Sequence, residues 1–148
     1  MKQEFTEYFE SLGMRRPYLD RTEELYRVAD QMSPAGIGDV FVSEYLDDGV
    51  RTPQSVWFFT TDLGYAIEAH FIENDQIDIF TIKGRVKNIV VRKKDYDFKS
   101  ATEKSRLNVR LKTDLDIERE MKASKENCDH LWHIVLTHFK NNLLYRPD

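Results

Sequence analysis

The sequence predicts an α+β domain in which two N-terminal helices precede a run of antiparallel strands and a long C-terminal helix. Apolar residues recur at helical spacing near both ends of the chain and alternate with polar residues in the middle. No linker, repeat or low-complexity segment divides the 148 residues. We therefore expect one domain over 1–148, with 1–36 as a helical extension and 38–144 as the sheet and the last helix.

The first 36 residues predict two helices. Residues 2–12 carry apolar side chains at i, i+3, i+4 and i+7, and Gly13 can end that helix. A second helix is expected over 21–32, with Asp20 as its cap and Glu23 completing a capping box. The predicted buried positions are Phe5, Tyr8, Phe9, Leu12, Leu25, Val28, Ala29 and Met32.

The middle of the chain predicts strands separated by short turns. Aromatic and β-branched residues are concentrated there, and Asp62-Leu63-Gly64 is typical of a hairpin turn. Residues 95–105 are polar and predict a loop, whereas Trp57, Phe58, Phe59 and Phe71 are expected to be buried. The predicted strands are 39–46, 55–61, 65–72, 77–82, 86–92 and 107–112, with a seventh over 115–121.

The last predicted helix runs from Asn127 to Leu144 and is amphipathic. Because an apolar helix face must be covered, we expect this helix to close the β layer. Its predicted buried face comprises Cys128, Leu131, Trp132, Val135, Leu136, Phe139 and Leu143. Its predicted polar side comprises Glu126, His130, His133, Thr137 and Lys140.

This order of strands followed by one helix with a tryptophan, Trp132, resembles the pleckstrin-homology-like superfold over residues 38–144. The resemblance implies an antiparallel seven-strand barrel, or a strongly bent sheet, capped by the long C-terminal helix with Trp132 pointing inward. It also implies a binding or scaffolding role. Lipid binding is not carried over, because the loop where family members place basic residues holds Asp47 and Asp48, with only Arg51 to compensate. A helix-grip fold of the START type is the alternative.

Composition excludes several classes of protein. The formal net charge of −4 argues against generic nucleic-acid binding, and no sequence-specific nucleic-acid partner is expected. Apolar runs reach only about four residues, far below the ~18 needed for a membrane span, and the N-terminus does not resemble a secretory signal. Cys128 is the single cysteine, so no internal disulfide can form, and a soluble protein in the reducing cytoplasm is expected.

Three residue sets could carry chemistry. Glu126, His130 and His133 share one helix side and could bind a metal, but no second element completes the shell, because His70 and His138 are unassigned; a solvated helix surface is the alternative. We therefore predict no metal and no cofactor. Cys128 could be a nucleophile, yet its apolar neighbours favour a core role. Glu68 and His70 share one side of a strand, without a defined pocket.

A basic stretch crosses the fifth predicted strand and could dock an acidic partner or another anionic surface. The alternative is that the strand pair is simply solvated, and that its charged side chains discourage edge-to-edge aggregation. The stretch comprises Lys83, Arg85, Lys87, Arg92, Lys93 and Lys94.

The sequence contains no recognisable catalytic or nucleotide-binding motif, so no catalytic residue is assigned. The leading hypothesis is a non-enzymatic binding or interaction module. The alternatives are a small-molecule or lipid binder with an internal cavity, and an uncharacterised enzyme. A protein partner or a second copy of the chain could bind.

Overall fold

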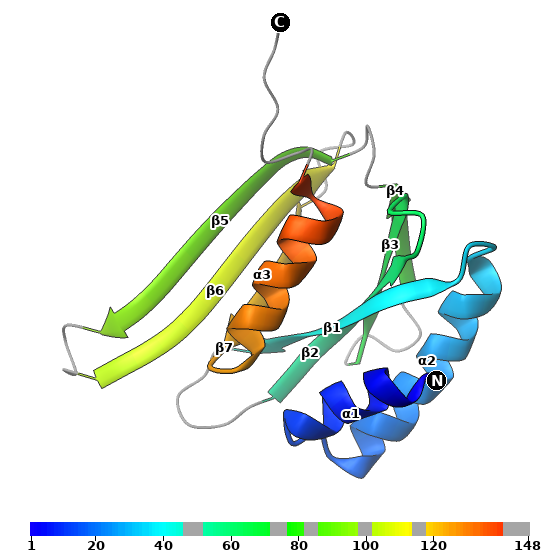
Figure 1. Ribbon diagram of the computed structural model, residues 1–148, viewed down its shortest axis with the longest axis horizontal. Coiled ribbons are helices and arrows are strands. Elements are labelled where there is room, and N and C mark those ends of the chain that lie inside the picture. Colours follow the sequence, from blue (N-terminus) through cyan, green and yellow to red (C-terminus); the bar gives the residue numbers. More distant parts are fainter. Residues whose placement is uncertain (46–51, 72–76, 82–85, 98–101, 114–117, 141–148) are drawn as a thin grey trace, which may run out of the picture.

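The computed structural model describes residues 1–45, 52–71, 77–81, 86–97, 102–113 and 118–140 (Figure 1). The α+β class is confirmed. The elements follow the order α1 (Gln3–Ser11), α2 (Arg16–Met32), β1 (Ile37–Tyr45), β2 (Thr52–Thr60), β3 (Tyr65–His70), β4 (Ile77–Thr81), β5 (Val86–Asp97), β6 (Thr102–Thr113), β7 (Glu118–Ser124) and α3 (Asn127–His138).

Helix α1 forms where its apolar periodicity predicts it, whereas α2 differs from the prediction, because Val28 and Met32, both predicted to be buried, are exposed. Gly13 has a φ of 74°, a left-handed conformation that suits glycine, and it follows the end of α1. Helix α2 begins at Arg16, so Asp20 lies inside it and the predicted capping box is wrong. Pro17 in its first turn explains the earlier start, since proline lacks the N–H that a helix leaves unpaired there.

The strands form two antiparallel sheets. Sheet A has the order β1-β2-β3-β4, and sheet B has the order β5-β6-β7. The turn between β2 and β3 contains the predicted Asp62-Leu63-Gly64, where the Gly64 N–H donates to Asp62 Oδ1 over 3.0 Å. Strand β6 begins at Thr102, within the predicted loop, and β7 is displaced from the predicted 115–121.

The predicted pleckstrin-homology-like barrel is therefore wrong, because the strands lie in two separate sheets. Strands β1 and β7 contact each other but form no ladder among the described residues. Side chains of β1 instead accept hydrogen bonds from backbone N–H groups of β7. Ser43 Oγ accepts from Lys122 N over 3.0 Å, and Glu44 Oε2 accepts from Ser124 N over 3.1 Å. A side chain between two backbones prevents direct strand pairing.

Both faces of sheet A are buried. One face packs against α1 and α2 through Phe5, Phe9, Val40 and Phe58, so the aromatic stripe of α1 packs on its own chain. The other face packs against sheet B and α3, and Figure 1 shows α3 in the angle between the two sheets. Successive side chains of a strand point to opposite faces of the sheet, so alternate residues enter one core and the residues between them enter the other.

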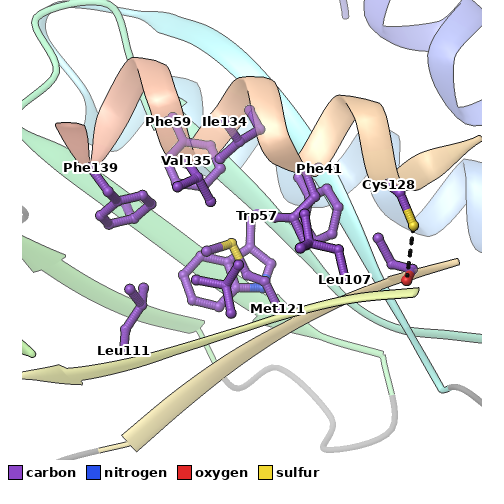
Figure 2. Close-up of a cluster of buried hydrophobic side chains, with 14 residues drawn as sticks. Phe41, Trp57, Phe59, Leu107, Leu111, Met121, Cys128, Ile134, Val135 and Phe139 are labelled. Atoms are coloured by element: carbon purple, nitrogen blue, oxygen red, sulfur yellow. Dashed lines mark hydrogen bonds between the residues drawn. The ribbon is translucent and has the colours of Figure 1, made fainter. Parts of the chain in front are cut away.

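Helix α3 covers the second core, but it is shorter and rotated differently from the prediction. It has 12 residues, and its buried side includes Ile134 and His138. Trp132 and Leu136, both predicted to be buried, are 45% and 46% exposed. Figure 2 shows Ile134 among the core side chains beneath α3. The inward Trp132 of the expected barrel is consequently wrong as well.

Candidate functional site

Polar residues gather where α3 crosses β1, and Asp39 lies at their centre. Its carboxylate accepts a hydrogen bond from His138 Nε2 over 2.6 Å, and its other oxygen lies 3.7 Å from His133 Nε2. The His138 ring is buried and stacks on Phe59 with centroids 4.6 Å apart. Asp39 therefore joins the C-terminal half of α3 to sheet A.

Asp39 is held in its ionised form. Burial opposes ionisation, but the hydrogen bond from His138 and the electrostatic attraction of the nearby imidazoles, that of His138 most of all, outweigh it, so the pKa of Asp39 lies below its ordinary value. An ionised carboxylate can only accept hydrogen bonds, so beside ring N–H donors it holds the helix and the strand together.

His130, one helical turn before His133, also contacts β1. Its Nε2 donates to the Val40 carbonyl over 2.6 Å, and its ring stacks on Tyr8 with centroids 4.0 Å apart. Burial lowers the pKa of His130, while the Val40 carbonyl and Asp39 oppose that shift. The neutral ring is therefore favoured, with its Nε2 proton directed at a carbonyl.

This geometry does not assemble the set Glu126, His130 and His133. His130 turns inward to Val40, whereas His133 is 59% exposed and leans toward Asp39. Across the described part of the chain, no group of three or more histidine, cysteine or acidic residues could hold a metal ion. His138, unassigned in the sequence, belongs with Asp39.

Asn127 is the second residue that joins several elements at the site, and the sequence analysis predicts it only as the first residue of the last helix. Its Oδ1 accepts from the Tyr8 hydroxyl over 2.6 Å, and its Nδ2 donates to Val42 O over 2.9 Å and to Glu44 Oε2 over 3.1 Å. The Tyr8 hydroxyl in turn accepts from Val42 N over 3.1 Å. This fully buried amide links α1, β1 and α3.

The predicted pair Glu68 and His70 does come together. Glu68 Oε1 lies 3.4 Å from His70 Nε2 and 3.7 Å from Arg119 Nε, while Ser55 donates to Glu68 Oε2 over 2.9 Å. Glu68 is buried between the sheets. Because Arg119 belongs to β7, this carboxylate connects sheet A with sheet B.

Cys128 lies in the core, as its apolar neighbours suggested. It is 7% exposed, and its Sγ lies 3.5 Å from the Ala123 carbonyl, the contact dashed in Figure 2. His130, two residues away, is directed at Val40 instead. This burial suits a small core side chain.

The basic stretch is only partly described. Lys83 and Arg85 lie outside the described residues, as do Asp47, Asp48 and Arg51 of the first loop. The backbone of β5 carries the remaining four basic residues, at the edge of sheet B. Docking of an acidic partner there stays a prediction.

A pocket of about 150 Å³ lies at the turn between α1 and α2 and at the ends of β1 and β2. Its lining includes Met14, Tyr18, Val42 and Glu44. It is not beneath α3, where Figure 2 shows the space occupied by large buried side chains such as Trp57 and Met121.

None of the helices in the described ranges combines the length and the apolarity needed to cross a membrane. No family model, no curated protein and no solved structure matches the chain. The pleckstrin-homology-like resemblance is thus neither supported nor refuted by a relative, and any function must be argued from the chain itself.

Proposed function

We propose that this chain is a non-enzymatic interaction module that binds another protein through the outer side of α3. The observation that carries the proposal is a pair of large apolar side chains, one turn apart, on the outer side of α3. The inner side of α3 covers the core, whereas Trp132 and Leu136 are nearly half exposed on the outer side.

The outer side of α3 is a continuous stripe. At about 100° per residue, the four helical residues of this stripe fall within an arc of about 100°, opposite the buried Ile134 and His138, and the fifth follows the end of the helix. We call this set the outer stripe: Asp129, Trp132, His133, Leu136 and Lys140, all exposed. Isolated exposed apolar residues are common, but a tryptophan one turn from a leucine has the composition of an interface centre.

The ionisable groups support an interaction role over catalysis. Asp39 is tied to His138, and Glu68 is tied to Ser55, so both carboxylates hold secondary-structure elements together. An active site instead concentrates such groups in a concave site. The pocket at the α1–α2 turn has one carboxylate in its lining, that of Glu44, which also accepts hydrogen bonds from Ser124 and Asn127.

Site-specific photo-crosslinking in the native cell tests the proposal. A benzophenone side chain replaces Leu136 in one variant and Leu63, which is equally exposed in the β2–β3 turn, in the matched control. We expect an adduct of one defined mass from position 136, absent from position 63 and lost when Trp132→Ala is added. The same adducts from both positions, or none from position 136, contradict the proposal.

A further inference from the structure

We infer that the outer stripe binds the outer stripe of a second copy of this chain, with the two α3 helices antiparallel about a twofold axis. The inference rests on the proposed function and names its partner. An isologous interface needs a surface that is complementary to itself. The outer stripe has that property in both its charges and its apolar residues.

The charges of the outer stripe lie at its two ends with opposite sign. Asp129 is in the first turn of α3, and Lys140 follows its C-terminus. Antiparallel pairing places Asp129 of each copy beside Lys140 of the other, which forms the same ion pair twice. Parallel pairing places like charges together, and it also aligns the two helix dipoles unfavourably.

The apolar pair lies between these charges. With the axis near the middle of α3, Trp132 of each copy packs near Leu136 of the other, so both exposed apolar side chains are covered. Fully burying a large apolar side chain is worth about 1.5–3 kcal/mol. A tryptophan at the centre of such a patch is the residue type that most often dominates binding energy.

The other exposed apolar pair of the structure lacks these features. Val28 and Met32 are 39% and 48% exposed and also lie one turn apart, on α2. The charged residues on the same side of that helix, Arg21 and Glu24, already pair with each other over 3.0 Å. By contrast, neither Asp129 nor Lys140 has an ion-pair partner among the described residues. The free complementary charges select α3 over α2.

The size of the interface predicts its strength. A helix of 12 residues is about 18 Å long, so two of them bury less than the ~1,200–2,000 Å² of a standard stable interface. We therefore expect a dimer that dissociates in the micromolar range. Its population must rise with protein concentration, which makes it measurable with the purified chain alone.

Sedimentation velocity of the full chain across micromolar to near-millimolar concentration tests the inference. We expect the wild type to shift from monomer to dimer, and the variant Trp132→Ala/Leu136→Ala to stay monomeric with an unchanged urea midpoint. The matched variant Val28→Ala/Met32→Ala removes the same kind of exposed pair from α2. It should dimerise like the wild type.

Charge-swap variants test whether these two charges contribute to dimerisation. Asp129→Lys alone and Lys140→Asp alone should each weaken dimerisation by about tenfold or more, and the double exchange should restore it. A wild type that is monomeric throughout, or a dimer that survives Trp132→Ala/Leu136→Ala or is not restored by the exchange, overturns the inference. A monomer that still gives the position-136 adduct with a different protein leaves the proposed function standing.

Discussion

Asn127→Ala should be the most damaging single polar substitution in the α3–β1 contact. The amide makes three hydrogen bonds, with the Tyr8 hydroxyl, the Val42 carbonyl and the Glu44 carboxylate. A buried polar group left without its partner costs about 1–3 kcal/mol. The Tyr8 hydroxyl and Glu44 each keep another hydrogen-bond partner. Even so, the free energy of unfolding should fall by about 3 kcal/mol. For a chain of this size that lowers Tm by about 6–12 °C.

Urea unfolding followed by circular dichroism measures this loss. The matched control is Asn108→Ala, because Asn108 is only half-buried and its amide donates one side-chain hydrogen bond among the described residues, to Glu120 over 2.6 Å. That control should lose about 1 kcal/mol. Tyr8→Phe and Asn127→Ala should also couple in a double-mutant cycle by at least about 0.5 kcal/mol. An Asn127→Ala variant as stable as the control refutes the view that this amide joins three elements.

Three other predictions follow from burial. In urea unfolding, Ile134→Ala should cost about 2–5 kcal/mol, and Trp132→Ala less than about 1 kcal/mol; the reverse order contradicts the observed rotation of α3. Because burial lowers the pKa of His130, the unfolded chain binds its proton first, so stability should fall as pH drops below the ordinary value of 6.5. His130→Gln should flatten the dependence of the unfolding free energy on pH between about pH 7 and 5. An unchanged dependence is evidence against a role of His130 in it. Native Cys128 should react with a thiol reagent far more slowly than the urea-unfolded chain; equal rates refute its burial.

Local patterns in the sequence predicted the elements whose signals are themselves local. Apolar spacing and Gly13 located α1, and the turn Asp62-Leu63-Gly64 located the β2–β3 hairpin. The alternation of Leu107, Val109 and Leu111 located part of β6 correctly, since all three are buried. These signals depend on residues fewer than about eight apart, so they survive whatever the rest of the chain does.

The arrangement of the sheets could not be read in the same way. A barrel and two separate sheets use the same alternating strands, and the difference lies at the contact between β1 and β7. Ser43 and Glu44 occupy that contact by accepting backbone N–H groups of Lys122 and Ser124. These partners lie about eighty residues apart in the sequence, and no local pattern shows that they meet.

The candidate site was only half visible for the same reason. The helical spacing of His130 and His133 was recognisable, but the carboxylate that His133 approaches is Asp39, which belongs to a strand roughly ninety residues earlier. Nothing in the alternation around Asp39 marked it as different from other polar strand residues. His138 was indistinguishable from a surface histidine until its partner was known.

The rotation of α3 connects the site with the proposed interface. Turning α3 so that Trp132 and Leu136 face the core would stabilise by at most about 1.5–3 kcal/mol, because both side chains are already about half buried, and it would expose Ile134. The same turn would carry Asn127 and His138 away from their partners on α1 and β1 and leave Glu44, Val42 and Asp39 with fewer hydrogen bonds. Each such group costs about 1–3 kcal/mol, and more where it is charged. The polar contacts therefore hold α3 in place, and an apolar pair remains on its outer side for a partner to cover.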